Sequence, residues 1–169
     1  MNQDAPQVSF LSDFPDHIPA LVEGLIAEWK EHDTNERRLE RTLKLEAHLH
    51  RSSLPLALVA HREGAPLGLV CLRETELDGQ DKLGPWLGGL FVYPEARKCG
   101  IGTCLCSAAE RVAFSLGYSE LYLFTLDQQH FYRRLGWQQH QSTSWHGRSG
   151  DILHRHLGQA GPDQNMTFL

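Results

Sequence analysis

Residues 90–102 carry the pattern with the clearest chemical meaning, L-F-V-Y-P-E-A-R-K-C-G-I-G. An apolar run ends at Val92, Tyr93 and Pro94 predict a turn, and a helical pattern begins at Gly100. The stretch therefore predicts a strand, a glycine-containing loop and the first turn of a helix. Such a loop points several backbone N–H groups the same way, at the positive end of the helix dipole. We expect it to bind an anionic group such as a phosphate or a pyrophosphate.

Three types of glycine loop compete as explanations of this pattern. The dinucleotide-binding fingerprint G-x-G-x-x-G needs a third glycine, and this chain has Leu105 at that position. The phosphate-binding pattern G-x-x-x-x-G-K-[ST] is absent. What remains is R-x-x-G-x-G directly after a strand, formed by Arg97, Gly100 and Gly102. The alternative without a ligand is a strand-to-helix turn that the two glycines make easier.

A second stretch, D-Q-Q-H-F-Y-R-R-L-G-W at 127–137, follows the next predicted strand. Together the two stretches resemble the GNAT superfamily of N-acetyltransferases, most strongly over 86–138. The first is similar to that family's acetyl-coenzyme A loop, and the second to its F-Y-x-x-x-G-[FW] element. The string D-Q-x-H-F-Y-x-x-L-G is also similar to one in the eukaryotic actin N-terminal acetyltransferase, which supports kinship within the superfamily and not a shared substrate.

The resemblance implies a binding site for acetyl-CoA as co-substrate. In this family the strand before the loop binds the pantetheine arm through its main chain, and the loop surrounds the pyrophosphate. Unpaired strand amides need hydrogen-bond partners, which an amide-containing arm supplies. Many members have an asparagine near Gln128 that contacts the coenzyme, and this chain departs from the family there. The implied coenzyme-binding residues are Leu90, Phe91, Val92, Arg97, Lys98, Cys99, Gly100, Ile101, Gly102, Thr103 and Gln128.

Tyr132 is the general acid that the resemblance implies. In many family members the tyrosine of this element donates a proton to the leaving thiolate. The ordinary pKa of a tyrosine, about 10, lies above the ~8.5 of a thiol, so the phenol stays protonated at neutral pH. The alternative role for Tyr132 is packing in the core or against the coenzyme.

The identity of the general base stays open. Some family members place a glutamate on the fourth strand, where this chain has Trp86, and an indole cannot take up a proton. Glu74, Glu76 and His130, the last acting through a water, are the candidates. An α-amine has a pKa of about 7.7–8.0 and is partly neutral at pH 7, so it needs no base, whereas a lysine amine at about 10.4 does.

Composition bounds the class of protein. With 169 residues, 41% of them hydrophobic, the chain suits one domain over 1–157 followed by a flexible tail at 158–169. A net charge of -5 and a pI near 6.0 argue against a nucleic-acid partner. The first residues predict no signal peptide, and no apolar run reaches the length of a membrane span. Four cysteines without a disulfide framework indicate reduced thiols and a cytoplasmic protein.

Ten histidines raise the question of a metal site. His48 and His50 are two residues apart, as are His154 and His156, and no Cys-x-x-Cys accompanies either pair. In a strand such a pair shares one face, which leaves a site open in principle. Without further ligands in the sequence pattern, we predict no metal.

The motifs must be positioned by alternating strands and helices. Apolar residues that recur every three or four positions, together with turn signals, predict the helices. In the second predicted helix, over 35–50, Leu39, Leu43 and Ala47 lie on one face. The expected strands are 8–11, 55–61, 66–73, 86–92, 121–125, 137–144 and 152–157, and the expected helices are 18–29, 35–50, 100–116 and 128–135. The order β-α-α-β-β-β-α-β-α-β-β gives an α/β (α+β) fold around a mixed, mostly antiparallel sheet with flanking helices. The GNAT fold has this order.

The sequence thus predicts an N-acetyltransferase that moves the acetyl group of acetyl-CoA to a primary amine. The amine would attack directly in a ternary complex, because no cysteine has a paired histidine and acid that would support a covalent acyl-enzyme. The expected acceptor is a small-molecule amine or a peptide N-terminus, with no nucleic acid and no membrane as partner, and the protein would be a monomer or homodimer. The alternative is an acyl-CoA-binding regulatory module without turnover.

Overall fold

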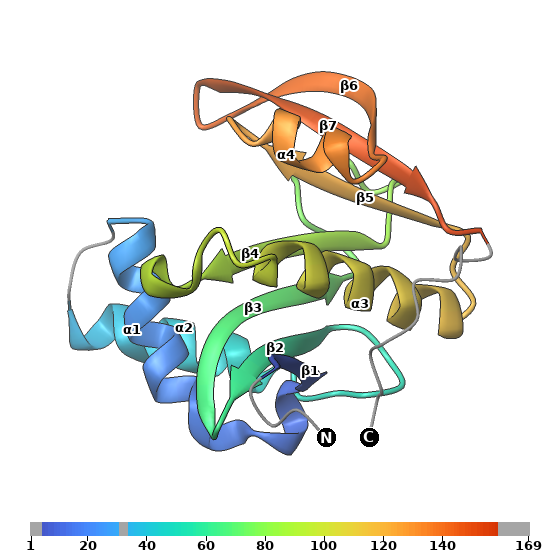
Figure 1. Ribbon diagram of the computed structural model, residues 1–169. Helices are drawn as coiled ribbons and strands as arrows, with labels where there is room; N and C mark the ends of the chain where they lie inside the picture. The colour runs from blue at the N-terminus through green and yellow to red at the C-terminus, as the bar shows by residue number, and fades with distance from the viewer. Residues whose placement is uncertain (1–4, 31–33, 159–169) are drawn as a thin grey trace.

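A seven-stranded sheet forms the centre of the protein, as the computed structural model shows for residues 5–30 and 34–158. Its strand order is β1-β2-β3-β4-β5-β7-β6, and only β4 and β5 run parallel to each other (Figure 1). The strands are β1 Gln7–Phe10, β2 Leu56–Arg62, β3 Ala65–Arg73, β4 Trp86–Val92, β5 Glu120–Thr125, β6 Gln138–Trp145 and β7 Arg148–His156. The helices are α1 Ile18–Glu28, α2 Asn35–Glu46, α3 Ile101–Ser115 and α4 Gln129–Arg134. This order confirms the predicted mixed α+β fold.

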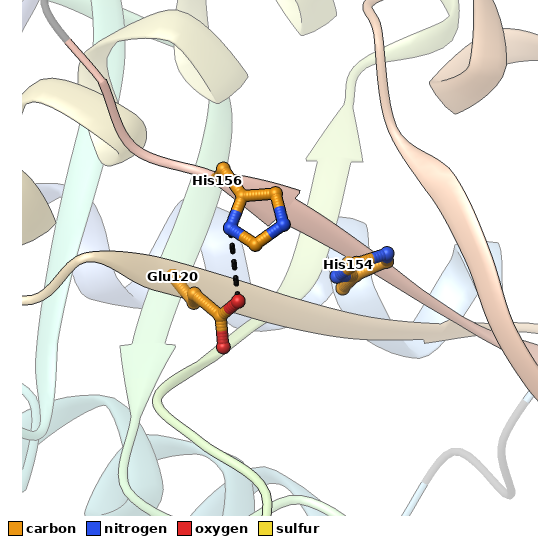
Figure 2. Close-up of side chains that lie close together, drawn as sticks. All are labelled: Glu120, His154 and His156. Atoms are coloured by element: carbon orange, nitrogen blue, oxygen red, sulfur yellow. Dashed lines mark ion pairs between the residues drawn. The ribbon is translucent and has the colours of Figure 1, made fainter.

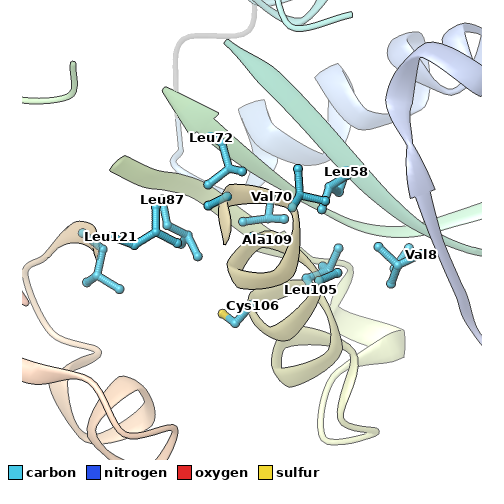
Figure 3. Packing of buried hydrophobic residues seen from close by; sticks show 14 of the residues in the cluster. Val8, Leu58, Val70, Leu72, Leu87, Leu105, Cys106, Ala109 and Leu121 are labelled. Atoms are coloured by element: carbon cyan, nitrogen blue, oxygen red, sulfur yellow. The ribbon is translucent and has the colours of Figure 1, made fainter. Parts of the chain in front are cut away.

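Helices cover both faces of the sheet, so the strands contribute side chains to two cores. Successive residues of a strand point to opposite faces. In β2, Leu56 and Leu58 therefore pack with α3, whereas Ala57 and Val59 pack with α1 and Leu45 of α2. Figure 3 shows the first core, in which α3 lies against the side chains of β2 and β3. Because both faces are covered, β2 reads in the sequence as an almost continuous apolar run.

Strands β4 and β5 part soon after they meet. Their ladder contains one residue pair, Trp86 with Tyr122, at the N-terminal end of β4. A bulge then interrupts the pairing of β4 with β3, and Gly89 within it has a left-handed φ of 61°. A glycine tolerates that backbone conformation without a Cβ clash. Strands β5, β6 and β7, together with α4, consequently turn away from the rest of the sheet (Figure 1).

Two predicted element boundaries were wrong. Helix α2 ends at Glu46 and not at residue 50, because the chain reverses through His48, whose N–H donates to the Leu45 carbonyl at 2.9 Å. Strand β7 begins at Arg148 and not at residue 152. There the turn between β6 and β7 is a tight hairpin whose His146 and Gly147 have φ values of 47° and 76°.

Within the described residues, nothing covers the face of α2 that carries Leu39 and Leu43. These two side chains are exposed, whereas Leu45, which lies on another side of the helix, is buried against α1. No helix within 5–30 and 34–158 combines the length and apolar character needed to cross a bilayer. The tail predicted at 158–169 lies outside the described residues, apart from Gly158.

Candidate active site

A cleft opens where β4 and β5 part. Its volume is about 750 Å³, and its walls come from the end of α1, the C-terminal half of β4, the loop before α3, the first turn of α3, and α4 with the residues before it. The predicted residues that the structure brings together here are Leu90, Phe91, Val92, Arg97, Lys98, Gly100, Ile101, Gly102, Thr103, Gln128 and Tyr132. Cys99, Glu74, Glu76 and His130 are not among the lining residues.

Six further residues line the cleft that sequence analysis did not assign to it: Glu28, Trp29, Ala96, Asp127, Phe131 and Arg134. Phe131 and Asp127 stand next to predicted residues in the second motif, so proximity in sequence was an available signal. Glu28 and Trp29 end a helix more than 60 residues before the loop, and no local pattern relates them to it.

The β4 backbone is arranged to bind a ligand through its main chain. One edge of the strand pairs with β3, with Phe91 opposite Leu69 and Val92 opposite Gly68. The other edge faces the cleft, since its ladder with β5 stops at Trp86. Backbone N–H and C=O groups are obligatory hydrogen-bonding groups, and those on this edge, apart from the Val92 carbonyl that accepts from Arg97, depend on water or a ligand for partners. The side chain of Phe91 meanwhile packs in the core beneath α1.

The first turn of α3 forms an anion-binding geometry beside this edge. Its N-cap, Gly100, is left-handed with a φ of 78°, and no side chain caps the helix. The N–H groups of Ile101, Gly102 and Thr103 therefore have no intrahelical acceptor. Together with the helix dipole they favour a negatively charged group at this end. A Cβ on Gly102 would lie 3.4 Å from the Phe131 ring, an ordinary van der Waals contact.

Arg97 ties the loop to its surroundings. Its Nε donates to the Val92 carbonyl at 3.0 Å, and its terminal nitrogen forms an ion pair with Glu28 of α1. The guanidinium thus links the end of β4, the loop and α1. Since its charge is shared with Glu28, the anion-binding character of this end of the cleft rests mainly on the backbone N–H groups of α3.

Tyr132 places a phenol in the opposite wall of the cleft. The residue is 8% exposed, and its ring lies edge-on to Phe131 and Trp137, with centroid distances of 5.0 Å and 6.1 Å. Burial, with a smaller contribution from the nearby Cys106, raises the pKa of Tyr132 well above its usual range. The phenol therefore stays protonated at neutral pH and is available as a hydrogen-bond donor.

A polar network lies at the β4 bulge, next to the cleft. Trp86, at the position expected for a catalytic glutamate, is fully buried, and its indole donates to the Leu83 carbonyl at 2.9 Å. Glu76 reaches the bulge from the preceding loop: a Cβ on Gly88 would lie 2.9 Å from its carboxylate oxygen. Arg73 donates to that carboxylate at 2.7 Å, and the Glu76 side chain is 24% exposed. A carboxylate is thus present near β4 although the strand itself carries none there.

His48 anchors the other side of Arg73. Its Nδ1–H donates to the Lys44 carbonyl at 2.6 Å, so its Nε2 is free to accept from Arg73 Nε at 3.0 Å. Burial lowers the pKa of His48 and keeps the imidazole neutral, as this acceptor role requires. The network fixes the Arg73 guanidinium and through it the position of Glu76.

The cysteines do not supply a nucleophile to the cleft. All four are free thiols, and Cys71 and Cys106 are buried, which raises the pKa of both. A thiol with a raised pKa carries little thiolate, the reactive form. No cysteine of the described residues lines the cleft.

Comparison with known proteins identifies the family. Residues 19–137, well over half of the chain, match the acetyltransferase (GNAT) family. The chain belongs to this family. The matched segment runs from the second residue of α1 to Trp137, three residues after α4, and includes every residue that lines the cleft. No curated protein sequence matches the chain.

Solved GNAT structures share the fold at low sequence identity. An aminoglycoside 6'-acetyltransferase type Ii superposes with a TM-score of 0.71 at 21% identity, covering 91% of this chain and 99% of the other. An aminoglycoside 6'-N-acetyltransferase complexed with coenzyme A gives 0.67 at 18%, covering 91% and 98%. The yncA protein of Salmonella typhimurium, solved with its cofactor acetyl-CoA, gives 0.66 at 16%, covering 95% and 99%.

The raised pKa of Tyr132 predicts a change in alkaline stability. In the unfolded chain the phenol ionises near its ordinary pKa of about 10, whereas in the folded GNAT domain it ionises only at higher pH. The contribution of Tyr132 to the free energy of unfolding is therefore fully present below pH 10. Above pH 10 this contribution should fall by up to about 1.4 kcal/mol per pH unit. Denaturant unfolding at pH 8 and pH 10.5 measures how much free energy of unfolding is lost between the two pH values. This loss should be smaller in Tyr132→Phe than in the wild type. A loss equal to that of the wild type would contradict the burial of the phenol, and Tyr118→Phe serves as the control.

Proposed function

We propose that the protein is an acetyl-CoA-dependent N-acetyltransferase that moves an acetyl group to a primary amine. The observation that carries this proposal is that three groups suited to the coenzyme line the same cleft. The unpaired edge of β4, the uncapped start of α3 and the Tyr132 phenol all face it. These groups match the amide-rich arm, the pyrophosphate and the thioester of the coenzyme, in that order. Family membership and neighbours solved with coenzyme A or acetyl-CoA support the same assignment.

In this proposal the coenzyme lies along β4 with its pyrophosphate at α3. Main-chain groups of Leu90, Phe91 and Val92 bind the pantetheine arm. Amides from Lys98 to Thr103 bind the pyrophosphate, with Cys99 contributing its backbone only, since its side chain lies outside the cleft wall. Gln128, which also lines the cleft, is the proposed contact from the opposite side.

The reaction is a direct transfer between two bound substrates. The neutral amine attacks the thioester carbonyl carbon, a C–N bond forms and the C–S bond breaks. The proton that the attacking nitrogen loses ends on the departing sulfur, through solvent or a base, so the coenzyme leaves as a thiol. A main-chain N–H near Phe91 or Val92 stabilises the oxyanion that forms on the carbonyl oxygen. Holding amine and thioester in line supplies a large part of the rate, because it removes the entropy cost of their encounter.

Tyr132 assists the departure of sulfur. Its phenol donates a hydrogen bond to the thiolate that develops as the C–S bond breaks. The raised pKa keeps the phenol protonated, and it also makes complete transfer of the proton less favourable. The hydrogen bond, which needs only a protonated donor, is therefore the main contribution that this geometry supports.

Glu76 is the proposed base when the acceptor amine needs one. It is the carboxylate that the structure places beside β4, and Arg73 holds it there. Glu74, Glu76 and His130 all lie outside the cleft lining, and Glu76 is preferred because Arg73 holds its carboxylate against Gly88 of β4. An acceptor amine with a pKa of about 7.7–8.0 would react without Glu76, because a usable fraction is already neutral at pH 7.

The acceptor is proposed to reach the thioester from the Trp29 side of the cleft. Trp29 is 46% exposed at the end of α1, and Arg41 of α2 stacks over its ring at 5.5 Å. An exposed indole offers a planar apolar surface to a bound molecule. Both a small-molecule amine and a peptide N-terminus fit such an open surface.

The second candidate is an acyl-CoA-binding module without turnover. One observation favours it: Trp86 occupies the strand position where family members carry a catalytic glutamate, and its side chain is fully buried in the core. Coenzyme binding without thiol release in the presence of any amine would support this function. The Tyr132 phenol in the cleft wall favours the transferase.

Calorimetric titration with acetyl-CoA tests the proposed coenzyme site. We expect a dissociation constant on the order of 1–100 μM for the wild type. Gly100→Glu should weaken binding by roughly tenfold or more, because it places a negative charge at the pyrophosphate site and forces a non-glycine residue into the left-handed region. Absence of binding by the wild type would contradict the proposal.

Gly147→Glu is the matched control for this titration. Gly147 has a φ of 76°, close to the 78° of Gly100, and a Cβ would meet no atom within 4 Å at either position. The substitution imposes the same backbone strain in the β6–β7 turn, away from the cleft. Equal loss of binding in both variants would show that strain, and not the site, is responsible.

Thiol release with a panel of amines tests the catalytic assignments. Tyr132→Phe should lower kcat by roughly ten- to a hundredfold while acetyl-CoA affinity stays within about threefold, because the phenol acts on the leaving group. The panel includes an aminoglycoside, the substrate named for two structural neighbours, together with a polyamine and a short peptide. Unchanged turnover in Tyr132→Phe would remove the residue from the mechanism.

The same assay separates the proposed base from its neighbours. Glu76→Gln keeps the shape of the side chain and its bond to Arg73 but cannot take up a proton. It should slow transfer to a lysine-like amine more than transfer to an α-amine, with Asp78→Asn in the same loop as the control. Equal effects on both amines would contradict the role of Glu76 as a base.

A further inference from the structure

Three side chains on β5 and β7 converge on the surface outside the cleft. Glu120 is the first residue of β5, and His154 and His156 lie near the end of β7. One ligand atom from each lies within 4.8 Å of the others (Figure 2). The His156 Nδ1 and a Glu120 carboxylate oxygen are already 2.9 Å apart.

The register of the sheet explains why they meet. In the antiparallel β5–β7 ladder, Glu120 pairs with His156, and Tyr122 pairs with His154. The two histidines are two residues apart in β7 and so point to the same face, as Glu120 and Tyr122 do in β5. The site is therefore built on paired strands and not on a loop, which holds side chains more precisely.

This face is distinct from the one that serves the cleft. Leu121 and Leu153, which alternate with the three residues along the strands, pack in the same core as Tyr132. Glu120, His154 and His156 consequently lie on the opposite side of β5 and β7. The proposed acetyl transfer makes no use of them.

From this geometry we propose that Glu120, His154 and His156 bind a divalent transition-metal ion of the Zn²⁺ class. Two imidazole nitrogens and one carboxylate oxygen are a ligand set that Zn²⁺ accepts, with a fourth position open to water. Imidazole ligands disfavour Mg²⁺ and Ca²⁺, which prefer oxygen. This proposal departs from the prediction of no metal that the sequence pattern led to.

The distances require only small side-chain movements. Ligand atoms about 2.1 Å from a tetrahedral ion lie about 3.4 Å from one another. The more widely spaced ligand atoms must therefore draw together by at most about 1.4 Å relative to the 4.8 Å limit, and the His156 and Glu120 atoms, 2.9 Å apart, must separate by about 0.5 Å. The His156 side chain is 70% exposed and that of Glu120 is 35% exposed, so both have room to rotate.

Neighbouring aromatic residues orient the ligands. The Tyr122 hydroxyl donates to the second carboxylate oxygen of Glu120 at 2.9 Å, which leaves the first oxygen facing His156. The His154 ring stacks on Tyr122 with a centroid distance of 6.2 Å, and His140 of β6 lies 5.5 Å from it on another side. Partners of this kind fix the orientation of metal ligands and raise affinity.

Zn²⁺ titration of chelator-treated protein without a histidine tag tests this site. We expect one equivalent to bind by calorimetry, and Co²⁺ to give the visible absorption of a bound ion at the same stoichiometry. His154→Ala and His156→Ala should each weaken Zn²⁺ binding by roughly tenfold or more. Zn²⁺ should also raise the Tm of the wild type and not of these variants, since an ion that binds only the folded state stabilises it.

His50→Ala is the matched control, because it removes an exposed histidine from the other pair of the same spacing. Glu120→Gln, which preserves the shape of the side chain, provides a second site variant if an alanine variant does not fold. Circular dichroism without metal checks the fold of every protein. The proposal would be overturned if the wild type did not bind Zn²⁺ stoichiometrically, or if the folded site variants bound it as tightly as the wild type. A loss of affinity in His50→Ala equal to that in the site variants would also overturn it.

Discussion

A single parallel contact between Trp86 and Tyr122 joins β4 to β5, and the site depends on the parting of the strands beyond it. The buried cluster of Trp86, Tyr122 and Ile152 holds the strands together at one end. The bulge at Gly89 then shifts the register of β4 against β3. The edge of β4 that faces away from β3 has no ladder partner beyond Trp86. Backbone groups in that position must bond to water or to a ligand. The cleft is thus a consequence of incomplete strand pairing, and its chemistry is that of unsatisfied amides.

The residues around the opening serve the fold and the site at the same time. Leu90 and Val92 pack against the α3 core while they line the cleft, and Ile101 is buried in the same core while its N–H belongs to the uncapped helix turn. Arg97 connects α1 to the end of β4 through Glu28. Binding through the main chain leaves side chains free for packing. In the proposed function, binding of this kind would tolerate the low identity, 16–18%, between this chain and the two neighbours solved with acetyl-CoA or coenzyme A.

Sequence reasoning succeeded where the determining signal is local. The order of elements followed from apolar periodicity, and contiguous motifs marked the loop before α3 and Tyr132, which the structure brings to one cleft. That this cleft binds the coenzyme stays a prediction. Sequence reasoning failed where the outcome depends on contacts between distant segments. The apolar face of α2 with Leu39 is exposed, since a periodic pattern shows which side of a helix is apolar and not what covers it. Nothing in the sequence places Glu76 against Gly88, or Glu120 across from His156, because both depend on register and loop path.

Amide hydrogen exchange with and without acetyl-CoA tests the central claim most directly, namely that backbone groups of β4 and α3 hold the coenzyme. The amides of 90–92 and 101–103 should exchange more slowly when the coenzyme is bound, while those of β2, which pair on both edges, should not change. Slower exchange should also persist in Tyr132→Phe, since the phenol acts on the leaving sulfur. Coenzyme binding that left the amides of 90–92 and 101–103 unchanged, with protection elsewhere in the protein, would contradict this account.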